Sequence, residues 1–179
     1  MLIVENTVLL VVDVQEKLVR VMSDRQVLIE NLEKIIKGAQ VLGIPILLTE
    51  QNPEGLGMTI PEVAHLLPDI QRIRKLSFSC CGSDRFIQTL KRVNRKQVLI
   101  SGIETHVCVY QTAADLLNLG YEVQVVTDAV SSRTAENRHI GLERIKDAGA
   151  ALTSTETALF ELLRVAEGAK FKELLKIVK

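Results

Sequence analysis

Strand-like apolar runs alternate with helix-length amphipathic segments along this chain. The run Thr7-Val8-Leu9-Leu10-Val11-Val12 is almost wholly apolar and rich in branched side chains, as is typical of a strand buried on both faces. Residues 24–42 then carry apolar side chains at helical spacing, and Gly43 follows them as a helix end signal. Repeated strand-then-helix units favour parallel strands with right-handed crossovers. This alternation predicts a three-layer α-β-α fold with a mostly parallel, about six-stranded sheet of Rossmann type.

The same pattern predicts the remaining elements. Ser23 or Asp24 is expected to cap the helix that ends at Gly43, and Ser83 or Asp84 to cap a later one. Residues 51–68 are rich in proline and glycine and are predicted to form a loop. No linker or repeat divides the chain, so residues 1–179 are expected to form a single domain. Further strands are expected at 45–49, 70–74, 98–100, 123–126 and 150–152, and further helices at 84–93, 107–119, 135–148, 156–166 and 170–178.

Composition excludes several classes of protein. Lys plus Arg and Asp plus Glu both number 22, so the formal net charge is zero and nothing favours a nucleic-acid partner. The 3 cysteines are too few for a secreted disulfide framework, and the first residues do not resemble a signal peptide. No apolar run approaches the roughly 20 residues that a membrane span needs. We therefore expect a cytoplasmic protein without a membrane partner.

Three chemically reactive side chains come shortly after predicted strands. Asp13 follows the first strand, Lys75 the third and Cys108 the fourth. Ligands of open parallel sheets bind beyond the carboxyl ends of the strands. A carboxylate, an ammonium group and a thiol are therefore expected at one edge of the sheet.

Each of these three residues also has a second interpretation. Cys108 stands at a predicted helix start, where unpaired N–H groups favour the nucleophilic thiolate, but position alone favours a small buried apolar residue. Asp13 ends an apolar strand and is either a partly desolvated base or a helix cap. Position alone leaves Arg72 and Arg74 as alternatives to Lys75.

The other cysteines and the histidines show no pattern of a metal or redox site. Cys80 and Cys81 are adjacent and outside any C-x-x-C motif, so they are interpreted as structural. His65, His106 and His139 lack metal-ligand spacing. Neither a G-x-G-x-x-G nor a Walker motif is present. No cofactor is therefore expected.

Taken together, the motifs resemble the isochorismatase-like cysteine hydrolases, the superfamily that includes nicotinamidases and N-carbamoylsarcosine amidohydrolases. The resemblance spans nearly the whole chain, and the loop at 49–57 is similar to that of the small uncharacterised hydrolases of the superfamily. It implies a catalytic triad of Asp13, Lys75 and Cys108, which selects Lys75 over the two neighbouring arginines. The motifs that carry it are Leu-Val-Val-Asp-Val-Gln at 10–15, Lys-Leu-Ser-Phe-Ser at 75–79, Ser-Gly-Ile-Glu-Thr-His-Val-Cys-Val at 101–109 and Thr-Asp-Ala at 127–129.

The resemblance also implies details of the site. A cis peptide bond is expected between Ile103 and Glu104, and the backbone N–H groups of Glu104 and Cys108 are expected to form an oxyanion hole. Family members are usually oligomers, so a homo-oligomer, a dimer or larger, is expected. Nicotinamidases hold a metal with an Asp-x-His loop after the second strand, whereas residues 50–52 here are Glu-Gln-Asn. We therefore expect no catalytic metal, and nicotinamide is disfavoured as the substrate.

The expected activity is hydrolysis of a C–N bond in a small amide, carbamoyl or related compound. Asp13 would take the thiol proton, Lys75 would support the ionised pair, and Cys108 would form a covalent acyl-enzyme. The alternatives are a catalytically idle binding or scaffold protein of the same fold, a thiol-redox protein, and ether hydrolysis of the isochorismatase type. The substrate pocket is expected to be lined by Gln15, Gln51, Asn52, Phe78, Glu104 and His106.

Overall fold

The computed structural model describes residues 1–179 and contains a six-stranded sheet in the order β3-β2-β1-β4-β5-β6. Every pairing between neighbouring strands is parallel. The predicted parallel sheet is therefore confirmed, with all strands rather than most of them parallel. The strands are β1 (Thr7–Val12), β2 (Ile46–Gln51), β3 (Arg72–Lys75), β4 (Gln97–Ile103), β5 (Glu122–Ser131) and β6 (Ala151–Thr153).

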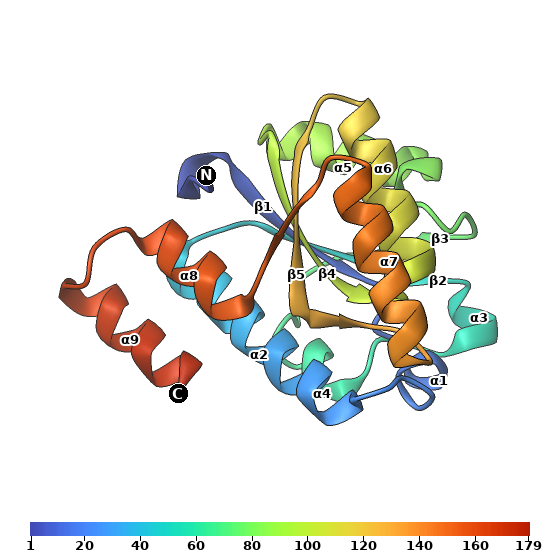
Figure 1. Cartoon of the computed structure of the whole chain (residues 1–179), viewed down its shortest axis with the longest axis horizontal. Helices are drawn as coiled ribbons and strands as arrows, with labels where there is room; N and C mark the ends of the chain where they lie inside the picture. Colours follow the sequence, from blue (N-terminus) through green and yellow to red (C-terminus); the bar gives the residue numbers. More distant parts are fainter.

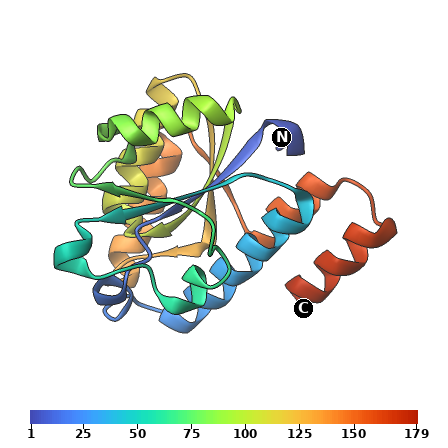
Figure 2. The ribbon, with the colours of Figure 1, turned by 180° about the vertical axis from the view of Figure 1, so that it is seen from behind.

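Helices cover both faces of the sheet and confirm the three layers (Figure 1). One layer contains α2 (Arg25–Leu42), α8 (Thr155–Leu163) and α9 (Gly168–Val178). The other contains α5 (Asp84–Val93), α6 (Tyr110–Asn118) and α7 (Ala135–Asp147). The view from behind shows α9, with the C-terminus, outermost in its layer (Figure 2). None of the helices has the length and apolar character needed to span a bilayer.

The alternation of side chains along β1 builds a core on each side of the sheet. Leu9 and Val11 pack in the cluster that includes Leu32 of α2. Leu10 lies in the opposite cluster, with residues of α5, α6 and α7. All residues of β1 are buried. The strand is continuously apolar because it has helices on both faces.

Short helices interrupt the segment that was predicted to be a loop. α3 (Pro53–Leu56) and α4 (Pro61–Ala64) lie between β2 and β3, and α1 (Glu16–Val19) follows β1. Each has only 4 residues, too few to show a helical apolar period. Proline at the first position of α3 and α4 was the available signal, because its fixed φ suits a helix start.

The predicted helix ends were partly right. Gly43 ends α2 in the left-handed conformation, with φ of 74°. The Ser83 hydroxyl caps α5 by accepting a backbone N–H of its first turn. Neither predicted cap of α2 acts as one: Asp24 makes no capping hydrogen bond, and the Ser23 hydroxyl donates to the carbonyl of Ser132. A tertiary contact with the segment after β5 thus occupies the Ser23 hydroxyl.

Candidate active site

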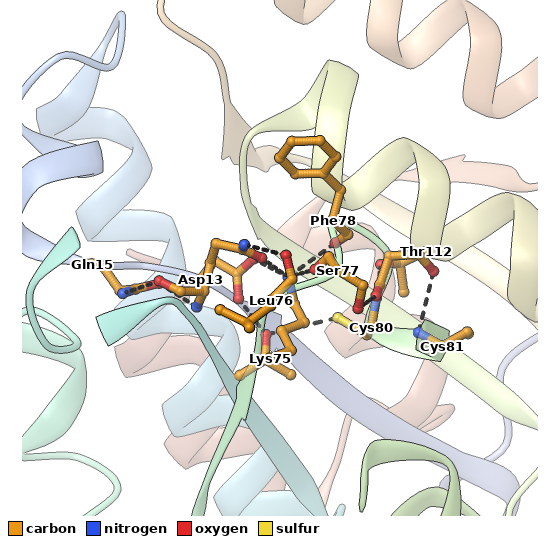
Figure 3. A network of polar contacts seen from close by, with 12 residues as sticks. Asp13, Gln15, Lys75, Leu76, Ser77, Phe78, Cys80, Cys81 and Thr112 are labelled. Atoms are coloured by element: carbon orange, nitrogen blue, oxygen red, sulfur yellow. Dashed lines mark hydrogen bonds and ion pairs between the residues drawn. The ribbon is translucent and has the colours of Figure 1, made fainter. Parts of the chain in front are cut away.

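Asp13 and Lys75 meet in a buried ion pair at the carboxyl edge of the sheet (Figure 3). Asp13 follows the last residue of β1, and Lys75 is the last residue of β3. Lys75 Nζ donates to Asp13 Oδ2 over 2.6 Å, and neither side chain is exposed. The order of the strands places β2 between them, so both side chains reach across the end of β2.

The ammonium group of Lys75 is surrounded by oxygen atoms. Besides Asp13, it donates to Gln51 Oε1 at 2.9 Å and to the carbonyls of Ser77 and Phe78 at 3.1 and 2.9 Å. Burial lowers the pKa of Lys75, but the charge of Asp13, followed by the thiols of Cys80 and Cys108, raises it above the ordinary value of 10.5. Lys75 is therefore a fixed cation at neutral pH.

The arginines beside Lys75 lie outside this cluster. Arg72 Nε lies 3.5 Å from Glu50 Oε1. Arg74 forms an exposed ion pair with Glu54 at 3.1 Å. The cation that reaches Asp13 is Lys75, as the family resemblance implied.

The backbone and both carboxylate oxygens of Asp13 are fixed. The residue has a φ of 50°, a left-handed conformation that is unusual for a residue with a side chain. Thr49 donates its hydroxyl to Asp13 Oδ1 at 2.7 Å, while Lys75 occupies Oδ2. The helix-cap interpretation is wrong, because the N-cap of α1 is Gln15 and its side chain makes no capping bond.

Cys108 lies in a wide helical turn, η3 (Thr105–Val109), that continues into α6. Cys108 is only 5% exposed. Burial is the largest cause that raises the thiol's pKa, to about 12, and the charge of Asp13 and a hydrogen bond with its carboxylate act in the same direction. Lys75 lowers this pKa by less. The expected thiolate is therefore wrong for the free protein, because desolvation outweighs the helix start, and the thiol faces Asp13 in its protonated form.

Glu104 precedes this turn and is held at two points. The peptide bond between Ile103 and Glu104 is cis. The carbonyl of Glu104 accepts the N–H groups of Val107 and Val109, both at 3.1 Å. Its carboxylate forms an ion pair with Arg133 at 3.1 Å, a partner that no sequence pattern indicated. The turn that contains Cys108 is thereby tied to the segment after β5.

Two glycines allow other elements to approach the site closely. A Cβ added to Gly102, whose φ is 112°, would lie 2.1 Å from the carbonyl oxygen of Val12, next to Asp13. A Cβ on Gly141 of α7 would lie 2.7 Å from the backbone nitrogen of His106. Larger residues at either place would displace the backbone next to Asp13 or Cys108.

The two glutamines expected to line the pocket hold the site together instead. Gln15 is fully buried, and its amide donates to the carbonyls of Gln51 and Gly57 at 2.9 and 2.7 Å. Its oxygen accepts the N–H of Gln51 at 2.7 Å. The prediction that Gln15 lines the pocket is wrong, because its hydrogen-bonding groups fix the loop after β2. The side chain of Gln51 binds Lys75 and the carbonyl of Leu76.

The remaining predicted pocket residues lie around this cluster. Asn52 and Lys75 help line a hollow of about 470 Å³, but Asp13 and Cys108 do not. This hollow lies at the outer edge, beside β3, and we do not take it to be the site of chemistry. Phe78 is 55% exposed, and its ring points away from Lys75 (Figure 3). His106 Nδ1 lies 3.0 Å from the hydroxyl of Ser132.

The sequence did not indicate that Thr49 and Cys80 belong to the site beside Asp13. Thr49 holds Asp13, and the buried thiol of Cys80 lies 3.8 Å from the Thr49 hydroxyl. Burial, followed by the charge of Asp13, raises the pKa of Cys80 to about 12. The position of Thr49 at the polar end of an otherwise apolar β2 was the only signal. Cys80 gave none, because the loop between β3 and α5 determines its place.

No group of three or more His, Cys, Asp or Glu side chains is arranged to hold a metal ion. Residues 50–52 stand where nicotinamidases carry metal ligands, but here Glu50 makes hydrogen bonds within the protein. Glu50 is buried and accepts the backbone N–H and the hydroxyl of Thr59 at 2.9 and 2.7 Å.

The chain is similar to known proteins over almost its whole length. The model of the isochorismatase domain matches residues 7–157. The secreted isochorismatase effector Isc1 of Phytophthora sojae is 40% identical, with 99% of this chain and 87% of that protein covered.

Solved structures share the same fold. The structure of the MAR1 ribonuclease from Caenorhabditis elegans has 38% identity and a TM-score of 0.93, and the match covers 99% of this chain and 91% of that one. The YcaC gene product of Escherichia coli, described as an octameric hydrolase of unknown specificity, has 27% identity and a TM-score of 0.93, with 98% and 88% covered. The family match begins at the first residue of β1 and reaches into α8.

Proposed function

We propose that this chain, which belongs to the isochorismatase domain family, is a cysteine hydrolase that cleaves a C–N bond of a small amide or carbamoyl compound. The observation that carries the proposal is the buried pair of Asp13 and Lys75, two charged groups that both act on the pKa of the Cys108 thiol. A nucleophile, a base and a charge partner in one buried cluster are the components of covalent acyl transfer.

The first step is attack by the thiol with removal of its proton. A thiol with a pKa of about 12 contains very little thiolate at neutral pH. Cys108 therefore attacks the carbonyl carbon as Asp13 accepts its proton, and the C=O electron pair moves onto the oxygen. Lys75 keeps the base ionised before this step and stays in place through it.

The tetrahedral intermediate then collapses and the acyl-enzyme is hydrolysed. We place the oxyanion against the N–H groups of Glu104 and Cys108. The C–N bond breaks, and Asp13 returns its proton to the departing nitrogen. Asp13 then takes a proton from water, whose oxygen attacks the thioester carbon. The C–S bond breaks, the acid is released, and Asp13 returns the proton to the sulfur of Cys108, which restores the thiol.

The burial of Cys108 favours a small substrate. Only 5% of the residue is exposed, so a slim acyl group reaches it more readily than a polymer does. For this reason, and because the formal net charge is zero, we propose no nucleic-acid substrate, although one similar structure is titled a ribonuclease. We do not propose ether hydrolysis of the isochorismatase type, because that reaction would leave the Cys108 thiol without a role as nucleophile.

The proposal has two further parts, on assembly and on location. We propose a homo-oligomer, supported by the octamer described for the Escherichia coli relative. A cytoplasmic location remains our proposal from the cysteine content, although one relative is named as a secreted effector.

Turnover of a panel of small amides and carbamoyl compounds tests the proposed activity. The wild type, Cys108→Ala and Cys81→Ala are compared. The Cys81 variant is the control, because that thiol is only half-buried and makes no hydrogen bond with Asp13 or Lys75. We expect turnover by the wild type and the control but none by Cys108→Ala. Undiminished turnover by Cys108→Ala contradicts the proposal, and a fully inactive panel favours the idle binding protein.

A further inference from the structure

We propose that Thr49 is a positioning residue that aims the Asp13 carboxylate at the Cys108 thiol. The inference rests on the proposed function, in which Asp13 is the base. Thr49 belongs to β2, between the strands that carry Asp13 and Lys75. It touches no substrate in this scheme and acts only through Asp13.

Thr49 contacts Asp13 at two points. Its hydroxyl donates to Oδ1 at 2.7 Å, and its carbonyl accepts the N–H of Asp13 at 3.2 Å. Both residues are fully buried, so no solvent competes for these groups. One neighbouring residue thus fixes both the left-handed backbone and the side chain of Asp13.

The Thr49 hydroxyl and Lys75 together restrain the Asp13 carboxylate. Lys75 alone, bonded to Oδ2, would leave the carboxylate free to turn about that contact. A second donor on Oδ1 fixes the plane of the group. An ionised carboxylate has about four acceptor positions, so capacity remains for the Cys108 thiol.

The direction of the Thr49 hydrogen bond is also fixed. An ionised carboxylate only accepts, so Thr49 must donate to Asp13. The thiol of Cys80 lies 3.8 Å from the Thr49 hydroxyl oxygen and is placed to donate to it. The result is a chain from Cys80 through Thr49 to Asp13.

Alkylation of Cys108 by iodoacetamide tests this inference without knowledge of the substrate. Trypsin leaves Cys108 alone in peptide 97–133, while Cys80 and Cys81 share peptide 76–85, so mass spectrometry follows each rate separately. Thr49→Val removes the hydroxyl and keeps the volume, and Thr49→Ser keeps the hydroxyl. Thr7→Val is the matched control, a fully buried threonine at the opposite end of β1 whose hydroxyl binds Ile3 and Gln97.

We expect Thr49→Val to slow the alkylation of Cys108 about tenfold at pH 7, a fraction of what a general base contributes. The rate is followed as a function of pH, and the whole profile of Thr49→Val should lie below that of the wild type, since its Asp13 carboxylate lacks the second donor that fixes it. Thr49→Ser should stay within about twofold of the wild type. Thr7→Val should keep the wild-type profile even where it lowers the melting temperature.

Three results would overturn the inference. They are a wild-type profile for Thr49→Val, an equal change in Thr7→Val, and a loss in Thr49→Ser as large as in Thr49→Val. If Thr49→Val does not fold, Thr49→Ala and Thr49→Ser decide by the same criteria. A wild-type profile for Thr49→Val beside inactive Cys108→Ala refutes only the role of Thr49, whereas turnover by Cys108→Ala refutes the proposed function.

Discussion

Lys75 donates a 2.6 Å hydrogen bond to Asp13 in a place where neither side chain reaches solvent. Moving two charges out of water costs several kcal/mol per ion, and such a pair is often no more stable than a well-packed apolar one. The three further oxygen acceptors around Lys75 offset part of that cost. We infer that the pair is retained for the reactivity of Cys108 rather than for stability.

Removal of the cation alone should destabilise the protein. Lys75→Met leaves a buried carboxylate without its partner and should lower the free energy of unfolding by about 3–5 kcal/mol. The double variant Asp13→Asn, Lys75→Met removes that unpaired charge and should recover part of the loss. Urea unfolding measures both values. A single variant as stable as the wild type, or a double variant no better than the single one, is inconsistent with this account.

Stability should decrease at alkaline pH. The pKa values of Cys80 and Cys108 are raised from 9.0 to about 12, so between these pH values the folded protein keeps protons that the unfolded chain releases. The free energy of unfolding therefore falls as pH rises from 9 towards 12, and the raised pKa of Lys75 acts in the same direction above 10.5. Denaturant titrations from pH 8 to 11 under reducing conditions should show this fall.

Cys80→Ala isolates one contribution to that pH dependence. Without this thiol, the decline in the free energy of unfolding across the same pH range should be shallower than in the wild type. An unchanged slope would show that Cys80 is not the buried, protonated group described above.

The close approach of α7 to the turn that contains Cys108 predicts a specific effect of Gly141→Ala. The added Cβ would meet the backbone of Thr105 and His106 at 2.7–2.8 Å, and backbone cannot rotate away. We expect amide hydrolysis to fall about tenfold or more, since small displacements of reacting groups carry large rate penalties.

Gly38→Ala is the matched control for this effect. Its Cβ would come closest to the side chain of Leu159, at 2.3 Å, in the layer of α2 and α8. It should lower stability by about 1–3 kcal/mol and leave the rate per folded molecule unchanged. Equal losses of activity in both variants would indicate a general loss of folded protein instead.

Gln15→Ala should loosen the loop that supports Lys75. The variant leaves the N–H of Gln51 and two carbonyls without their partner, at an expected loss of about 1–3 kcal/mol. Hydrogen exchange of the Gln51 amide should accelerate. Gln26→Ala, which removes an exposed bond to Glu30, should leave that exchange rate unchanged. An unchanged exchange rate of the Gln51 amide in Gln15→Ala would contradict the role of Gln15 in fixing this loop.

The sequence was sufficient for the architecture because the apolar patterns were strong. The continuous run of β1 and the strand–helix alternation predicted the parallel, three-layer arrangement that the structure has. The short helices α1, α3 and α4 were missed because 4 residues show no periodicity.

The electrostatic state of the site depended on contacts that a sequence does not display. Position at a helix start suggested a thiolate at Cys108, but burial among residues from distant segments raised its pKa. Gln15 was expected to face the substrate, yet the path of the loop after β2 directs its amide inward. Thr49 and Cys80 approach Asp13 only through the packing of β2 and the loop before α5.

A single-turnover mixture quenched with acid and digested with trypsin tests the central claim most directly. With any amide that the wild type hydrolyses, peptide 97–133, which contains Cys108 as its one cysteine, should gain the mass of the acyl group. The adduct should decay at the rate at which the acid product appears. Full turnover without an adduct, or an adduct on peptide 76–85, which contains Cys80 and Cys81, would contradict the account.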